Sequence, residues 1–315
     1  MTRSNLVSEK LIYMATRSWK YIFAFLLLVL SALVLAIYEF PDKDLHIIAC
    51  NVGQGDAILI THGFTQILTD GGPDKSVLTC LGKHMPFYDR RIELVISTHP
   101  DADHSTGLVG VMQNYKVDKL LINPINPGTQ VYQALISEVG GGGIEVVNPT
   151  AGMRVGVGLI YLDILSPSNE TLSKLKVKDV ASDLSKYDVA KETNLYSVVY
   201  KLSFKYFTAI LLGDAPQEVS DHLANTWGMG YVNYIKIPHH GSINGLTENY
   251  LKVLMPKVAV ISVGKNSWGH PRPEILEMLE RYNVKVLRTD QIGDIAVVSD
   301  GEKYWLSTKI ADRID

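Results

Sequence analysis

The stretch IELVISTHPDADH, residues 92–104, joins an apolar run to a crowded group of polar side chains. Residues 92–96 are mostly apolar and predict a buried strand. Directly after it stand four side chains that can bind a metal ion: His99, Asp101, Asp103 and His104. Carboxylates placed this close repel one another unless a cation lies among them. The stretch therefore favours a metal site that activates water, at the end of a strand, over a polar surface loop.

Length and composition define the class of protein. The chain has 315 residues, of which 46% are hydrophobic and 20% are charged, so it can form one large globular domain or two small ones. Its formal net charge of -3 argues against holding nucleic acid by bulk electrostatics. The two cysteines, Cys50 and Cys80, lack the spacing of a zinc ribbon, and a single bridge between them stays open.

An apolar segment near the N-terminus predicts a transmembrane helix. Residues 21–40 are apolar except for Ser31 and Glu39, and about 20 helical residues cross the roughly 30 Å hydrocarbon layer of a bilayer. A cleaved signal peptide is the alternative, with the small side chains around residues 34–36 as the cleavage region. The length of the run favours the anchor, because a signal peptide has only about 7 to 15 apolar residues.

Charged residues around this segment predict its orientation. Four basic residues precede it: Arg3, Lys10, Arg17 and Lys20. Acidic residues predominate just after it, so the positive-inside rule keeps residues 1–20 in the cytoplasm. Residues 41–315 are then expected to form one domain outside the cytoplasmic membrane.

Short apolar runs alternate with amphipathic segments along the rest of the chain. The runs predict strands in two groups, one between residues 45 and 147 and one between residues 158 and 299. The amphipathic segments predict helices around residues 107–113, 131–139, 218–226, 246–254 and 273–282. Two β-rich halves with peripheral helices favour an α/β fold in which two sheets pack face to face beneath outer helices.

Further polar side chains stand where predicted strands end. Asp70 follows one strand and can orient a metal-binding histidine through its second ring nitrogen. Asp214 follows a second strand and can bridge two cations. His239 and His240 follow a third, where a histidine can bind metal, donate a proton or stabilise an oxyanion. His270 lies in a glycine-flanked loop after a fourth strand.

Taken in order, these motifs resemble the metallo-β-lactamase superfamily, and within it the C-terminal domain of ComEC competence proteins. The similar segments are residues 54–56, 68–72, 98–104, 194–197, 211–214, 236–242, 262–279 and 286–293. The resemblance covers nearly all of residues 45–305. It implies an αββα sandwich, an α/β fold of two mixed sheets packed face to face with helices outside, carrying a two-metal site along one edge.

The resemblance also implies a set of metal ligands. One ion is expected on His99 and Asp101, and Asp214 is expected to bridge it to a second. The second ion is expected on Asp103, His104 and His270, with His240 left open as the ligand in place of His270. Asp101 stands where the superfamily commonly has a histidine, so oxygen supplies more of the ligands. That change moves the expected preference from zinc towards manganese, without excluding zinc.

The remaining site residues are assigned by the same resemblance. Three are expected to take part in catalysis, as proton acceptor or as partners of the leaving group: Asp103, His239 and His240. Four are expected to contact substrate: Asn194, Ser197, Ser242 and Asn266. Two are expected to support the ligands from behind: Asp56 and Asp70.

Two divalent ions, manganese or zinc, would hold a bridging hydroxide and orient a phosphodiester. The resemblance implies a membrane-anchored nuclease or phosphodiesterase that acts on DNA, with a separate DNA-uptake channel protein as partner, since one membrane helix does not make the channel. The first alternative is hydrolysis of a small cell-envelope phosphoester, such as phosphocholine on teichoic acid. The second is a non-catalytic binding module at the membrane.

Overall fold

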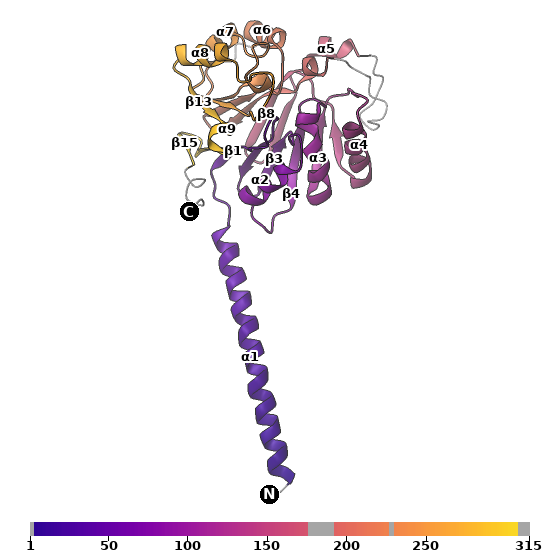
Figure 1. Ribbon diagram of the computed structural model, residues 1–315, viewed down its shortest axis with the longest axis vertical. Coiled ribbons are helices and arrows are strands. Elements are labelled where there is room, and N and C mark those ends of the chain that lie inside the picture. The colour runs from indigo at the N-terminus through magenta and orange to yellow at the C-terminus, as the bar shows by residue number, and fades with distance from the viewer. Residues whose placement is uncertain (1–2, 176–191, 227–229, 308–315) are drawn as a thin grey trace. The chain divides into compact units, whose positions relative to one another are not determined.

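The computed structural model describes residues 3–175, 192–226 and 230–307, and the chain divides into two units. The first unit consists of Met1–Pro41 with Pro86–Tyr88. Helix α1 (Arg3–Tyr38) makes up most of it and contains an apolar span, Trp19–Tyr38, that is long enough to cross a bilayer (Figure 1). The span predicted over residues 21–40 therefore begins and ends two residues earlier. Residues 3–20 of the basic segment predicted over residues 1–20 belong to the same helix, and residues 1 and 2 lie outside the described residues.

The second unit contains two sheets. One has eight strands in the spatial order β15-β14-β1-β2-β3-β4-β5-β6. Its strands are β1 (Leu45–Ala49), β2 (Ile58–His62), β3 (Thr65–Thr69), β4 (Arg91–Ser97), β5 (Lys116–Ile122), β6 (Glu145–Val147), β14 (Ile295–Ser299) and β15 (Tyr304–Leu306). The other has seven, in the order β13-β12-β11-β10-β9-β8-β7. Its strands are β7 (Arg154–Val157), β8 (Ile160–Ser166), β9 (Val199–Phe204), β10 (Phe207–Leu211), β11 (Tyr234–Lys236), β12 (Val258–Ile261) and β13 (Lys285–Arg288).

Helices and short 3-10 turns connect these strands. The larger ones are α2 (Ser76–His84), α3 (Ala102–Asn114), α4 (Gln130–Gly142), α6 (Gln217–Thr226), α7 (Glu248–Leu254) and α8 (Pro273–Arg281). The shorter ones are α5 (Asn169–Ser173), α9 (Thr289–Ile292), η2 (Thr193–Tyr196) and η3 (Pro238–Gly241). Helix α2 and strands β7 and β15 were not predicted from the sequence.

Three apolar clusters separate four layers of structure. Along β1, Leu45 and Ile47 are buried between the two sheets, whereas Ile48 faces the opposite way. That opposite cluster packs the first sheet against α2, α3 and α4, and a third cluster packs the second sheet against α6, α7 and α8. The layers are therefore helix, sheet, sheet and helix, and the predicted sandwich is confirmed (Figure 1).

Parallel strand pairing brings the polar strand ends to one edge. Strands β3, β4 and β5 run parallel in the first sheet, and β10, β11, β12 and β13 run parallel in the second. The carboxyl ends of parallel strands share one edge of a sheet. Because the sheets pack face to face, the residues after β3 and β4 lie beside those after β10 and β11.

The metal-binding stretch is partly helical, because the helix predicted around residues 107–113 begins earlier. Helix α3 begins at Ala102, so Asp103 and His104 occupy its first turn. Asp101 has extended backbone angles at the N-cap, and its carbonyl accepts the N–H of Ser105. The predicted start near Gly107 was too late because the first turn is polar and shows no apolar periodicity.

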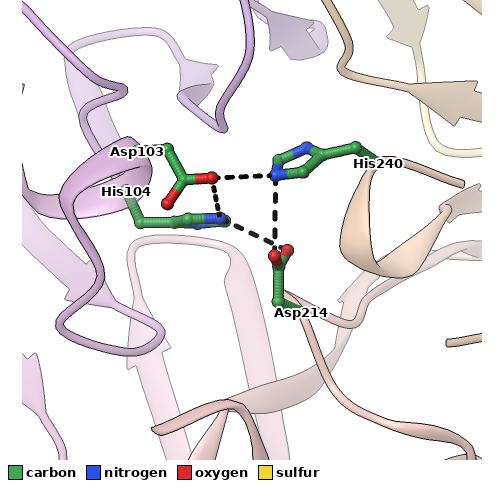
Figure 2. A group of neighbouring side chains, drawn as sticks. All are labelled: Asp103, His104, Asp214 and His240. Carbon is green, nitrogen blue, oxygen red and sulfur yellow. Dashed lines mark hydrogen bonds and ion pairs between the residues drawn. The ribbon is translucent and has the colours of Figure 1, made fainter. Parts of the chain in front are cut away.

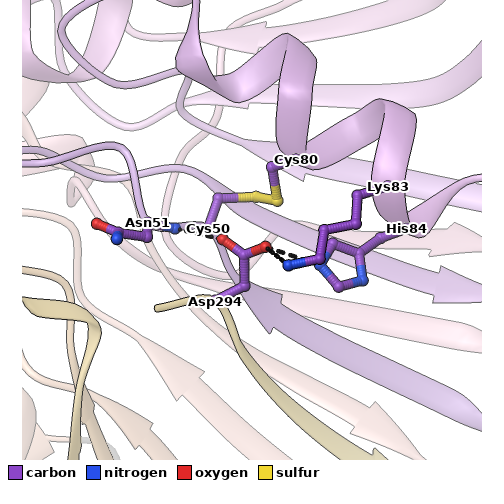
Figure 3. The surroundings of a disulfide bond; sticks show 6 residues. All are labelled: Cys50, Asn51, Cys80, Lys83, His84 and Asp294. Atoms are coloured by element: carbon purple, nitrogen blue, oxygen red, sulfur yellow. Dashed lines mark hydrogen bonds and ion pairs between the residues drawn. A yellow bond between two sulfur atoms is a disulfide. The ribbon is translucent and has the colours of Figure 1, made fainter. Parts of the chain in front are cut away.

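A disulfide ties the end of β1 to α2. Cys50 and Cys80 are bonded, which settles the pairing that the sequence left open (Figure 3). Beside the bond, Asp294 accepts the backbone N–H of Asn51 at 2.9 Å and contacts Lys83 and His84 at 3.0 Å each. Burial alone would raise the pKa of Asp294, but these three partners outweigh it and hold the pKa well below the ordinary value. Asp294 thus links the start of β14 to the two segments that the disulfide joins.

Replacing both cysteines with serine is expected to lower the free energy of unfolding by about 3–4 kcal/mol, the loop-closure value for a bridge across 30 residues. Urea unfolding of the full chain in detergent, compared with the unreduced parent, measures this loss. A double Cys50→Ser/Cys80→Ser variant that unfolds at the parent's urea concentration would show that the bridge does not constrain the unfolded chain.

Candidate metal centre

Four side chains from three segments meet at the shared sheet edge. Asp103 and His104 project from the first turn of α3, Asp214 follows β10, and His240 lies in η3 after β11 (Figure 2). Each offers one ligand atom, and these four atoms all lie within 4.8 Å of one another. The group alternates carboxylate and imidazole, which is a donor set that divalent transition metals accept.

Short distances join these groups in a ring. His104 Nε2 lies 3.3 Å from Asp214 Oδ1, and His240 Nε2 lies 3.5 Å from Asp214 Oδ2. His240 Nε2 also lies 3.3 Å from Asp103 Oδ2. Asp214 therefore faces both imidazoles, and its role as a bridging carboxylate stays a prediction.

Hydrogen bonds fix which ring nitrogen of each histidine faces the centre. His104 Nδ1 lies 2.8 Å from Asp70 Oδ2, and His240 Nδ1 lies 2.9 Å from the carbonyl oxygen of Ser262. Both partners can only accept, so each Nδ1 carries the proton and donates it. In the neutral imidazole each Nε2 then points an unprotonated lone pair at the centre, the arrangement that a metal-binding histidine needs. Asp70 contacts the His104 ring on the side away from the centre, and its role behind a metal ligand stays a prediction.

His99 lies next to this group with the same tautomer. The Thr98 hydroxyl donates to Asp70 Oδ2 at 2.7 Å, so it accepts from His99 Nδ1 at 3.0 Å. The ring centroids of His99 and His104 are 4.1 Å apart, and His99 Nε2 lies 3.7 Å from Asp101 Oδ2. His99 and Asp101 thus form a second pair of donors beside the first group.

Buried polar atoms without hydrogen bonds test whether a metal fits. Within the described residues, His99 Nε2, His104 Nε2 and Asp214 Oδ1 are buried and have no hydrogen-bond partner. Leaving such atoms unpaired costs about 1–3 kcal/mol each, more for charged groups. All three lie on the side where the ligand atoms converge, so the residues present fit a divalent metal.

The electrostatics of the site favour added positive charge. Burial alone would lower the pKa of His104, but Asp214 and Asp70 outweigh it and raise this pKa well above the ordinary value. Burial is likewise outweighed at His240, whose pKa rises to about 9 beside Asp214 and Asp103. Burial would raise the pKa of Asp214, yet His104 and His240 hold it well below the ordinary value. A bound cation would supply positive charge at the place where the carboxylates otherwise favour protonated imidazoles.

A buried ion pair lies behind the ligands. The ammonium of Lys236, the last residue of β11, contacts the carboxylate of Asp56, and both side chains are buried. Asp56 Oδ1 lies 3.5 Å from His240 Nδ1 and Oδ2 lies 4.0 Å from His104 Nδ1. Asp56 therefore lies next to both imidazoles, and its supporting role stays a prediction. Lys236 received no role from the sequence, although a lysine in an otherwise apolar strand was the available signal.

His270 lies outside the group of four. Its ring centroid is 5.8 Å from that of His239 and 6.3 Å from that of Trp268, on which it stacks. Its Nδ1 is buried and has no hydrogen-bond partner within the described residues. The alternative ligand, His240, takes the place predicted for His270, whose ligand role stays a prediction. His239 is half-buried between them, and its catalytic role is likewise untested.

The predicted substrate residues fall into two pairs. In and after η2, Asn194 Oδ1 and Ser197 Oγ are buried and, within the described part of the chain, have no hydrogen-bond partner. Ser242 and Asn266 instead brace loops. Ser242 Oγ accepts the Asn244 N–H at 3.2 Å, and the Asn266 side chain accepts the His270 N–H and donates to the His270 carbonyl. Substrate contact by these four residues stays a prediction.

Comparison with known proteins supports this assignment of the fold. No family model matches the chain. It is 25% identical to ComE operon protein 3 of Bacillus subtilis, over 83% of this chain and 34% of that protein. It is 24% identical to Recombination protein 2 of Haemophilus influenzae, over 87% of this chain and 31% of that protein. The chain thus spans about a third of the length of these relatives, and the predicted resemblance to competence proteins is confirmed.

Solved structures show the fold directly. The metallo-β-lactamase fold protein YhfI from Bacillus subtilis matches with a TM-score of 0.52 and 10% identity, over 82% of this chain and 100% of that one. CmlA from Streptomyces venezuelae, a diiron β-hydroxylase, matches with a TM-score of 0.52 and 12% identity, over 81% of this chain and 54% of that one. The chain has the metallo-β-lactamase fold, which hosts more than one chemistry.

Proposed function

We propose that this chain is a membrane-anchored, metal-dependent phosphodiesterase that hydrolyses DNA. The observation that carries the proposal is the convergence of Asp103, His104, Asp214 and His240, whose inward ligand atoms include buried ones without hydrogen-bond partners. Similarity to a recombination protein and a competence protein makes DNA the first substrate to test.

Two divalent ions fit the arrangement of donors. His99 and Asp101 would hold one, while Asp103, His104 and His240 would hold the other, and Asp214, which faces His104 and His240, would bridge the two. Carboxylate oxygens make up half of the main group, so manganese and zinc are both suited. When bound, such ions activate a water molecule and neutralise charge on a phosphoryl group.

The chain's own residues would perform the remaining steps. Asp70 and the Ser262 carbonyl keep His104 and His240 in the ligand tautomer. Asp103 keeps 36% of its side-chain surface exposed, so its free oxygen can take a proton from the attacking water. His239 is half-buried next to His240 and can protonate the departing oxygen.

An exposed tryptophan that stacks on His270 favours nucleic acid over a small ester. The Trp268 ring is 63% exposed and stacks on His270. Aromatic side chains bind unpaired bases by stacking, which is worth about 1–3 kcal/mol per base. Trp268 can therefore hold a base next to the scissile phosphate. A net charge of -3 gives the protein little general attraction for DNA, so local contacts of this kind must position the strand.

The cellular setting proposed for this activity is the outer side of the cytoplasmic membrane. The apolar span of α1 supplies a single anchor, and the basic residues before it keep the N-terminus in the cytoplasm. The disulfide fits an oxidising compartment. A separate DNA-uptake channel protein is the proposed partner.

Full-length protein in detergent, loaded with manganese or zinc, is expected to cleave single-stranded DNA and bis-p-nitrophenyl phosphate. Asp103→Asn and His104→Ala variants should lose both activities. The Trp268→Ala variant should cleave DNA about 10-fold more slowly or worse, and it should hydrolyse the small diester at the parental rate. Cleavage of the diester without any DNA degradation would replace the nuclease with a small-phosphoester hydrolase. If neither metal supports hydrolysis, the protein is a non-catalytic binding module instead of an enzyme.

A further inference from the structure

The end of the second unit away from the metal centre carries exposed apolar side chains. They stand in turns and loops that precede or join strands: Phe64, Leu159, Tyr206, Tyr231 and Met255. Tyr206 is 82% exposed, and the others are between 44% and 57% exposed. We call these five side chains the hairpin-tip surface.

Contacts between the first-sheet and second-sheet turns make the surface continuous. A Cβ atom at Gly158, next to Leu159, would lie 3.0 Å from the Thr65 hydroxyl, so the β7–β8 turn abuts the β2–β3 turn. The rings of His62 and Phe204 are 4.9 Å apart, which joins the β2–β3 turn to the β9–β10 turn.

Further contacts join the β9–β10 turn to the loops before β11 and β12, which extends the hairpin-tip surface across the second sheet. The Thr208 N–H, two residues after Tyr206, donates to Asn233 Oδ1 at 2.9 Å. The Asn233 amide in turn lies 3.4 Å from the Tyr231 hydroxyl. The Lys257 ammonium lies 5.8 Å from the centre of the Tyr231 ring, which brings in the loop that holds Met255. The five side chains therefore share one end of the sandwich.

Single strands connect this surface to the metal centre. Phe64 precedes β3 and Asp70 follows it, while Tyr206 precedes β10 and Asp214 lies three residues beyond its end. A five-residue strand is about 17 Å long. The hairpin-tip surface and the metal centre therefore lie at opposite ends of the same strands.

The chain also tethers this end to the anchor helix. The apolar span ends at Tyr38 and β1 begins at Leu45, so an extended connection reaches about 25 Å at most. Leu45 pairs with His62 at the end of β2, and an added Cβ at Gly63 would lie 3.9 Å from the Asp42 carbonyl oxygen. If α1 crosses a membrane, the hairpin-tip surface cannot leave the vicinity of that membrane.

We propose that the hairpin-tip surface seats in the interfacial layer of the bilayer that holds α1. Tyrosine is enriched at this depth because its ring is apolar and its hydroxyl is polar. The Lys257 ammonium lies 5.8 Å from the centre of the Tyr231 ring, where the lysine stem can lie along apolar surface and the ammonium group can reach headgroups. Seating points the metal centre away from the bilayer, towards substrate in the aqueous phase. The proposal rests on the proposed anchoring.

Nitroxide labels on the full chain in phosphatidylcholine vesicles test this seating. Labels go on Tyr206→Cys and Leu159→Cys, with Glu218→Cys in exposed helix α6 as the matched control. Cys50 and Cys80 are disulfide-bonded and do not react. At positions 206 and 159, we expect several-fold less collision with a water-soluble nickel complex than at position 218, and more collision with oxygen.

Two failures can be told apart. If the protein floats with the vesicles and resists alkaline carbonate extraction, but all three labels meet the nickel complex equally, the seating is wrong and the anchor stands. If the protein does not float, both the anchor and the seating are wrong. Neither result depends on hydrolytic activity, so the proposed nuclease is judged separately.

Discussion

Asp214→Asn is expected to reduce hydrolysis of bis-p-nitrophenyl phosphate by about 100-fold or more and to lower the amount of bound metal. One carboxylate oxygen of Asp214 lies 3.3 Å from His104 Nε2, and the other lies 3.5 Å from His240 Nε2. An amide keeps the shape but loses the charge and one acceptor. Even the substitution of a residue that only supports a ligand lowers metal affinity or activity 10–100-fold, so substitution of a central ligand should exceed that range. Activity and metal content, measured on the same purified sample, check the expectation.

Asp221→Asn is the matched control for this substitution. Asp221 lies in α6 on the exposed surface, so the same chemical change there should alter neither activity nor metal content. An Asp214→Asn protein that binds parental amounts of metal and turns over at the parental rate would remove Asp214 from the centre. Loss of activity with full metal content would instead assign Asp214 to substrate or proton handling.

Much of the fold could be predicted because its signals are local. Apolar runs ending in Asp70, His99 and Asp214 indicated buried strands, and those strands are present. Helix α2 was missed because its sequence, SVLTCLGKH, begins directly after a turn and has a short apolar stripe. The first turn of α3 was missed because metal-binding residues replace the apolar positions that mark a helix.

The choice between His240 and His270 shows what the sequence could not decide. Both residues follow predicted strands, and a linear pattern carries no information about which imidazole points inward. The backbone places His240 in the group of four: His239 and His240 both have positive φ values, near 50°, and this tight turn directs His240 Nε2 towards Asp214. Non-glycine residues adopt this region rarely, so an apolar run could not reveal the turn.

Lys236→Met and Asp56→Asn are each expected to lower the free energy of unfolding by about 3–5 kcal/mol, because each leaves a buried partner of the ion pair uncompensated. The double variant should recover part of that loss, which a double-mutant cycle from urea unfolding of the full chain in detergent measures. Arg91→Met, which breaks the exposed contact with Asp118, is the control and should cost about 1 kcal/mol or less.

The same pair predicts a pH dependence. Burial would raise the pKa of Asp56, but Lys236 and His240 outweigh it and lower the pKa to about 2. Because the folded pKa lies below the unfolded value of about 3.9, ionised Asp56 stabilises the protein above that value, and this contribution is lost as the pH falls towards 2. Without the lysine, burial opposes ionisation, so Lys236→Met should lose this part of the acid sensitivity. A Lys236→Met protein whose stability falls with acid as steeply as the parent's would mean that Lys236 does not hold the Asp56 charge, and that the histidines alone do.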